Sequence, residues 1–203
     1  MTTTFRHCDF HVHTELSGEK QASGFTLEKL FATADALGLT HVGDSEHWKL
    51  STSPDLFHRI RDEVERLQPK YRVKVFVSAE IDVLNSRGDL ACDVKEAEKI
   101  LDYVSVAISH YDTEGAEQLL PDRVDDTVAM IQAVCRIPAV TMLMHPQIVY
   151  GHNIKSIKSE IPADVYAEVM RTIVAANKVV DYPSVRMCEC WLSEIGLSDE
   201  QLA

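Results

Sequence analysis

Histidine and glutamate residues close five short segments of this chain, and their types and spacing indicate metal binding. The first segment is Asp9-Phe10-His11-Val12-His13-Thr14. The others are Gly43-Asp44-Ser45-Glu46-His47, Ser78-Ala79-Glu80, Ile108-Ser109-His110 and Leu143-Met144-His145-Pro146. Successive side chains of a β-strand alternate between its two faces, so His11 and His13 project from the same side. Two imidazoles on one side of a strand end can reach one metal ion.

The number of candidate ligands indicates more than one metal ion. Imidazole and carboxylate ligands without cysteine suit Zn²⁺, Mn²⁺ or Fe²⁺. One ion takes three or four protein ligands, so this set exceeds the need of a single ion: His11, His13, His47, Glu80, His110 and His145. Glu80 closes an apolar run where an unpaired carboxylate is costly, and it is the natural bridge between two ions. Paired metals roughly 3.5–4 Å apart make a shared water more acidic and clamp phosphate oxygens, which favours hydrolysis.

Alternating strands and helices are expected to position these side chains. Strands are predicted at residues 7–13, 39–44, 72–78, 103–109, 139–144 and 178–182, with His47 lying beyond the second. Helices are predicted at 26–37, 53–69, 94–100, 122–135 and 163–176. This alternation predicts a parallel sheet, either open and doubly wound or closed into a barrel. Ligands arriving from five successive strands favour the barrel, because closure brings the strand ends to one point.

Composition is typical of one large globular domain. The 203 residues are 45% hydrophobic and 26% charged, with a net charge of −12. This acidic balance gives no general attraction to nucleic acid or to anionic lipid. The chain begins without the pattern of a signal peptide and contains no apolar run of membrane-spanning length. Its five cysteines are scattered and odd in number, which favours reduced thiols and a cytoplasmic location.

The segments taken together resemble a known family. The combination of His11-Val12-His13-Thr14, Gly43-Asp44-Ser45-Glu46-His47, Ala79-Glu80-Ile81-Asp82-Val83-Leu84, Ser109-His110 and His145-Pro146 is similar to the PHP (polymerase and histidinol phosphatase) family. The segments around His47 and Glu80 look most like its histidinol-phosphatase branch. The similarity runs in order from about residue 7 to residue 150.

The resemblance implies a fold and a metal centre. The implied fold is a distorted (β/α)7 TIM-like barrel, and the implied cofactors are two or three divalent ions of zinc, manganese or iron. By position, His11, His13 and Glu80 would hold the first metal, and Glu80, His110 and His145 the second. His47 would hold the third, with Glu19 at a position where many members carry a ligand. An exposed loop acid remains an alternative reading of Glu19.

The chain also departs from the family pattern. Family members carry a final Asp-x-His pair beyond the sixth strand, and no such pair follows His152 here. The expectation is a single PHP-like domain over residues 1–203 that lacks its last strand and helix. Either the sequence is a fragment or the protein has a reduced site. In a reduced site the second metal should be best preserved, which makes Glu80, His110 and His145 the expected catalytic residues.

The predicted function is therefore metal-dependent hydrolysis of phosphate monoesters by a metal-activated water. The expected substrate is a small phosphorylated metabolite, without nucleic acid or membrane partners. Arg87, in the loop after Glu80, is a candidate phosphate clamp because guanidinium binds oxyanions bidentately. A solvated loop arginine is the alternative. Two other functions stay open: a metal-dependent amidohydrolase, and a degenerate metal-binding barrel without turnover.

Overall fold

The computed structural model describes residues 8–108, 123–146 and 163–181. The strands are β1 (Cys8–Val12), β2 (His41–Trp48), β3 (Lys74–Asp82), β4 (Val104–Ala107), β5 (Val140–Met144) and β6 (Val179–Val180). The α-helices are α1 (Leu27–Ala36), α2 (Asp55–Leu67), α3 (Val94–Ile100), α4 (Arg123–Cys135) and α5 (Ala163–Ala175). Short 3₁₀ helices are η1 (Glu15–Ser17), η2 (Lys20–Ala22) and η3 (Gln68–Lys70). Among the described residues, every helix is too short or too polar to span a membrane.

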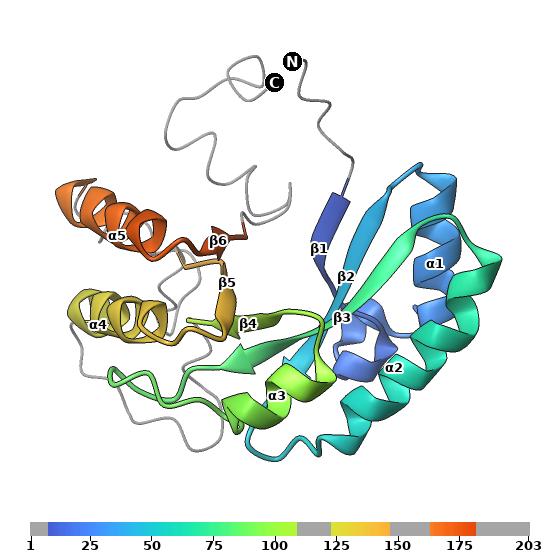
Figure 1. The fold of residues 1–203 in the computed structure, drawn as a ribbon, viewed down its shortest axis with the longest axis horizontal. Helices are drawn as coiled ribbons and strands as arrows, with labels where there is room; N and C mark the ends of the chain where they lie inside the picture. The colour runs from blue at the N-terminus through green and yellow to red at the C-terminus, as the bar shows by residue number, and fades with distance from the viewer. Residues whose placement is uncertain (1–7, 109–122, 147–162, 182–203) are drawn as a thin grey trace.

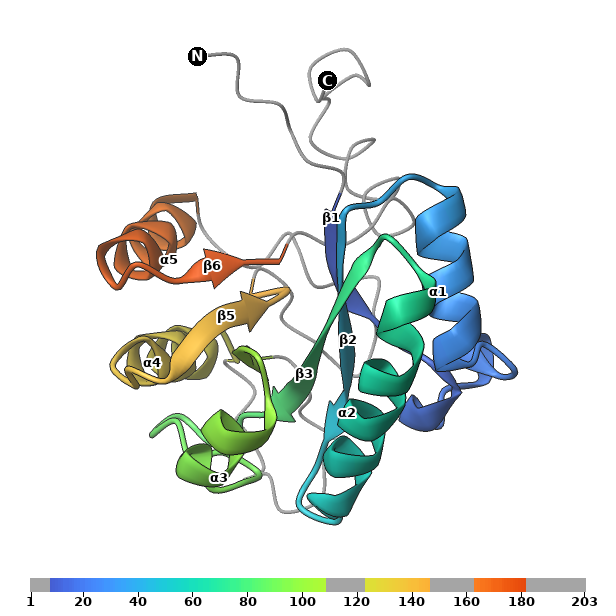
Figure 2. The ribbon, with the colours of Figure 1, turned by 45° about the vertical axis from the view of Figure 1, so that its right-hand side comes forward.

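The six strands form one parallel sheet in the order in which they occur in the chain, from β1 to β6. Figures 1 and 2 show this sheet curled, with β1 and β6 as its edges and the five α-helices on the outer side. The predicted parallel α/β architecture is confirmed as a curled half-barrel. The described strands number six, so the structure supports part of a barrel and does not establish the expected count of seven.

The second and third strands run further than the sequence suggested. Pairing between β2 and β3 continues to Trp48 and Ile81, so His47 lies inside β2 directly beside Glu80. The expectation that His47 lies beyond its strand is wrong. Polar residues in 44–47 looked like the end of a strand, but their backbone groups stay paired to β3 and their side chains are covered on both faces.

Apolar helix stripes cover the outer face of the sheet. Thr26 caps α1, with its Oγ1 accepting a hydrogen bond from the backbone N–H of Lys29 at 3.2 Å. Buried residues follow helical spacing in α1 (Leu27, Leu30, Phe31, Ala34) and in α2 (Phe57, Ile60, Val64, Leu67). One face of β3 supplies Val75, Val77, Ala79 and Ile81 to the same core. The other face, with Phe76, Ser78 and Glu80, is therefore left for the inside of the curl.

The inside of the curl is filled in layers below the strand ends. Tyr103 reaches from the start of β4 to β1, where its hydroxyl donates to the carbonyl of Phe10 at 2.6 Å. The ring passes over Gly43, which has no side chain to obstruct it; an alanine Cβ there would collide with the Tyr103 hydroxyl. One step toward the carboxyl ends, Ser78 and Ser105 share a hydrogen bond of 2.8 Å between their hydroxyls. These layers fill the interior of the curl directly below Glu80.

Candidate metal centre

The predicted ligands that the structure describes lie together at the carboxyl-terminal edge of the sheet. His11 is in β1 and His13 follows it, His47 and Glu80 are paired neighbours in β2 and β3, and His145 follows β5. We call Glu80 and these four histidines the Glu80 cluster. His110 lies outside the described residues, so its place in the second metal site stays a prediction.

Glu80 is at the centre of this cluster and is 1% exposed. Its Oε1 lies 2.6 Å from His145 Nε2. Its Oε2 lies 3.0 Å from His47 Nδ1 and 3.3 Å from His13 Nε2. His11 Nε2 is 3.7 Å from the same oxygen. Each carboxylate oxygen therefore faces a different set of imidazoles, which is the arrangement of a bridging ligand.

The imidazoles also lie close to one another. The Nε2 atoms of His11 and His13 are 3.2 Å apart, and the rings of His13 and His47 are stacked with centroids 4.6 Å apart. Two groups of three residues have ligand atoms within 4.8 Å of one another, namely His11, Glu80 and His145, and His13, Glu19 and His47. Nitrogen and carboxylate donors gathered at these separations fit Zn²⁺ or a similar ion. Such an ion would lie between groups that otherwise crowd together.

The electrostatics of the cluster favour positive charge. Burial lowers the pKa of His11, but hydrogen bonds with Asp181 and Glu80 outweigh burial and raise the pKa to about 10. His47 shows the same balance: burial lowers its pKa, while Glu80 and Glu19 raise it above the ordinary value. Buried carboxylates thus create a negative field that either protons or metal cations can offset.

Glu19 lies where the family resemblance expected a third-metal ligand. It directly precedes η2, and its Oε1 is 3.2 Å from His47 Nε2. The Glu19 side chain is 39% exposed. Glu19 and Glu80 therefore contact the two different ring nitrogens of His47. The exposed-acid reading accounts for its solvent contact but not for this position; ligation by Glu19 stays a prediction.

The backbone of His145 adopts an unusual conformation. Its φ is +34°, a region that side-chain-bearing residues rarely enter. The next residue is Pro146, and a residue before proline ordinarily prefers an extended backbone. The side chain is held at Glu80 and the residue is buried. Backbone strain of this kind is concentrated at functional sites, which supports a functional role for this imidazole.

Asp181 is a member of the site that sequence reasoning missed. It directly follows β6, and its Oδ2 lies 2.8 Å from His11 Nδ1. The predicted sixth strand, 178–182, contained this residue at its carboxyl end, which was the available signal.

A second acidic pair lies behind the cluster, on the outer face of β2. Thr14 donates from both its backbone N–H, at 2.7 Å, and its hydroxyl to Glu46 Oε1. Asp44 is fully buried beside Glu46. Burial raises the pKa of Asp44 well above the usual carboxyl range, and the neighbouring Glu46 adds to this. Burial likewise raises the pKa of Glu46, against the opposing hydrogen bonds from Thr14. Glu46 thus anchors the turn that immediately follows His13.

Arg87, the candidate phosphate clamp, lies in an exposed hairpin after β3. Its guanidinium is 3.2 Å from a carboxylate oxygen of Asp89. The adjacent Gly88 packs on α4, where an added Cβ would be 2.8 Å from that of Ala133. This part of the hairpin therefore contacts the outer helix layer rather than the inside of the curl. Substrate binding by Arg87 stays a prediction.

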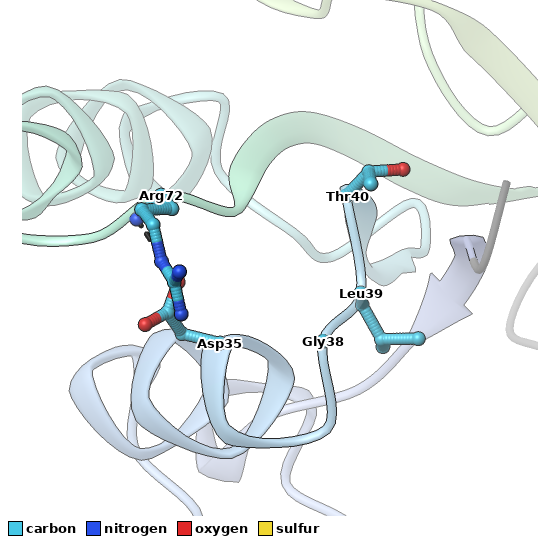
Figure 3. Close-up of a pocket in the computed structure, with 5 residues that line it drawn as sticks. All are labelled: Asp35, Gly38, Leu39, Thr40 and Arg72. Atoms are coloured by element: carbon cyan, nitrogen blue, oxygen red, sulfur yellow. Dashed lines mark hydrogen bonds and ion pairs between the residues drawn. The ribbon is translucent and has the colours of Figure 1, made fainter.

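A cavity of about 280 Å³ occurs at the other end of the strands, away from the Glu80 cluster. Figure 3 shows Asp35 beside Arg72, with Gly38, Leu39 and Thr40 across the cavity. Leu39 and Thr40 precede β2, and Arg72 precedes β3, so this cavity lies at the amino ends of the strands. Active sites of parallel α/β proteins lie at the carboxyl ends, where the Glu80 cluster is.

Comparison with known proteins finds a similarity of fold to solved structures. No protein-family model and no curated protein sequence matches this chain. The fold is similar to the crystal structure of histidinol phosphate phosphatase from Lactococcus lactis subsp. lactis, solved with zinc, L-histidinol and phosphate. The TM-score is 0.54 at 15% sequence identity, covering 87% of this chain and 73% of the other. At this identity the similarity establishes a shared fold.

Proposed function

We propose that this protein is a metal-dependent phosphoesterase that hydrolyses phosphate monoesters of small metabolites. The observation that carries the proposal is the convergence of His11, His13, His47 and His145 on the two oxygens of buried Glu80. The fold similarity supports it, because that phosphatase was crystallised with zinc and phosphate.

The chain's own residues have distinct parts in this function. Glu80 would bridge two metal ions, since its Oε1 faces His145 and its Oε2 faces His13 and His47. His11, Glu80 and His145 form one candidate metal site, and His13, Glu19 and His47 form another. Bound Zn²⁺ supplies Lewis-acid chemistry there, polarising phosphoryl oxygens and making water more acidic. The imidazoles are partly buried yet reach solvent, with side chains 10–18% exposed, so a small substrate can approach them.

The test is phosphate release from a panel of substrates by zinc-reconstituted protein. The panel contains histidinol phosphate, other phosphorylated metabolites and p-nitrophenyl phosphate, with N-acyl amino acids as the arm for an amidohydrolase. We expect zinc-dependent phosphate release. Glu80→Gln and His145→Ala should reduce kcat/KM by about 10³-fold, since metal charge stabilisation is worth several kcal/mol.

The matched control is Glu63→Gln, which changes a surface glutamate paired with Arg66 on α2. It should leave kcat/KM within about twofold, because exposed ion pairs contribute little. Equal phosphatase activity in wild type and Glu80→Gln would contradict the proposal. Amide hydrolysis without phosphate release would replace it with the amidohydrolase function.

A further inference from the structure

The two edge strands of the sheet are linked at the metal site by one side-chain pair. β1 pairs with β2, and β6 pairs with β5. Across the gap between these edges, His11 Nδ1 lies 2.8 Å from Asp181 Oδ2. Both side chains are mostly buried, at 14% and 17% exposure. This contact joins the start of the sheet to its end at the level of the Glu80 cluster.

The position of Asp181 is fixed by the strand that carries His145. The backbone N–H of Asp181 donates to the carbonyl of Leu143 at 2.9 Å, which extends the pairing of β6 with β5. Leu143 is two residues before His145. The carboxylate therefore has a rigid support and lies at a set distance from the ligands on β5.

The contact determines which nitrogen of His11 faces the cluster. An ionised carboxylate only accepts hydrogen bonds, so a neutral imidazole beside it carries its proton on Nδ1. The lone pair is then on Nε2, which lies 3.2 Å from His13 Nε2 and 3.7 Å from Glu80 Oε2. The Asp181 oxygen is on the opposite side of the ring from these atoms. It therefore contacts the imidazole on the side that faces away from the Glu80 cluster.

We propose that Asp181 is a positioning residue that holds His11 in the Nδ1–H tautomer and aims Nε2 at the metal site. The inference rests on the proposed function only in requiring that the Glu80 cluster binds a divalent ion. A carboxylate behind a metal-binding histidine fixes the orientation of the ring and makes the ligand more basic, and its loss typically costs about 10–100-fold in metal affinity.

Zinc affinity provides the first test, measured by competition with a chromophoric chelator on the 203-residue chain. Asp181→Ala should weaken zinc binding by about 10–100-fold. Asp181→Asn should weaken it less, because the amide oxygen still accepts from Nδ1–H but lacks the charge. Asp62→Ala, at an exposed position of α2, should leave the affinity unchanged. If Asp181→Ala lowers the melting temperature, zinc affinity is compared between wild type and Asp181→Asn instead, because asparagine has nearly the same shape as aspartate.

Long-range ¹H–¹⁵N NMR spectra of the histidine side chains provide a second readout that general destabilisation does not reproduce. In zinc-loaded wild type, His11 should show a protonated Nδ1 and a zinc-bound Nε2. Asp181→Ala should lose this pattern at His11 while His145 keeps its own. Wild-type zinc affinity and an unchanged His11 tautomer in Asp181→Ala would overturn the positioning role. Absence of zinc binding in wild type would instead overturn the proposed function.

Discussion

His11 and Asp181 are 170 residues apart in the chain, yet Nδ1 of the first lies 2.8 Å from Oδ2 of the second. The contact spans the edges of a curled sheet whose first and last described strands pair only with their inner neighbours. The candidate metal centre is therefore assembled from both ends of the sheet. Its geometry depends on the curvature that the helices and the interior layers maintain.

Zinc should stabilise the folded protein, because the Glu80 cluster is assembled only on folding. At a zinc concentration of 100 times the dissociation constant, the gain is about 2.7 kcal/mol. For a chain of this length that corresponds to a rise in melting temperature of roughly 5–10 °C. Differential scanning fluorimetry of chelator-treated protein, with and without zinc, measures it. Magnesium, which prefers oxygen ligands, is the control, and equal melting temperatures with zinc and with chelator would contradict the assignment.

Gly43→Ala should destabilise the protein by about 1–3 kcal/mol, because overpacking forces neighbours to shift. The new Cβ would meet the Tyr103 hydroxyl and lie 2.8 Å from the carbonyl oxygen of Phe10. Urea denaturation measures the change. Adding Gly43→Ala to the Tyr103→Phe variant should cost less stability than adding it to wild type, because one of the two collisions is removed. Full stability of Gly43→Ala would mean that Tyr103 does not cross the interior at this point.

Thr14→Val should also lower the free energy of unfolding, by roughly 1–3 kcal/mol, because a buried acceptor loses one of its donors. The hydroxyl and the backbone N–H of Thr14 both donate to Glu46. Thr33→Val, at an exposed position of α1, is the matched control and should change stability much less. Chemical denaturation of both variants provides the comparison, and equal losses would show that the Glu46 contact is not what stabilises this turn.

Thiol reactivity should distinguish Cys92 from Cys8. Burial raises the pKa of Cys92 to about 12, and the nearby carboxylates of Asp93 and Glu96 act in the same direction. A raised thiol pKa means that the group stays protonated as pH rises, so at pH 8 only about one Cys92 in ten thousand is thiolate. Cys8 is exposed. Iodoacetamide labelling followed by peptide mass spectrometry should modify Cys8 well before Cys92, and the reverse order would contradict the partly buried position of Cys92.

Local sequence patterns were sufficient to predict the elements and much of the gathering of side chains. The helical spacing of Leu27, Leu30 and Phe31 predicted α1, and apolar runs before Glu80 and His145 predicted β3 and β5. Glu80 and His145 are then expected on the same side of the fold, because parallel strands place their carboxyl ends together. Metal binding by these residues remains a prediction that awaits experiment.

The remainder of the site depends on contacts between distant parts of the chain. Nothing near Asp181 in the sequence reveals that curvature brings it to His11. The second strand was predicted to end at residue 44, because the pattern of a single strand does not show that β3 continues beside the polar residues that follow. Asp44 is completely buried beside Glu46, and Glu46 is in turn held by Thr14 from the turn after His13.

Zinc content tests the central claim most directly. After zinc loading and desalting, elemental analysis should find two or three equivalents of zinc per wild-type chain. Glu80→Gln should retain at least one equivalent less, because the candidate site formed by His11, Glu80 and His145 loses its carboxylate. Glu63→Gln should match wild type. A wild-type protein that retains no zinc, or a Glu80→Gln variant that retains the full amount, would contradict a metal centre bridged by Glu80.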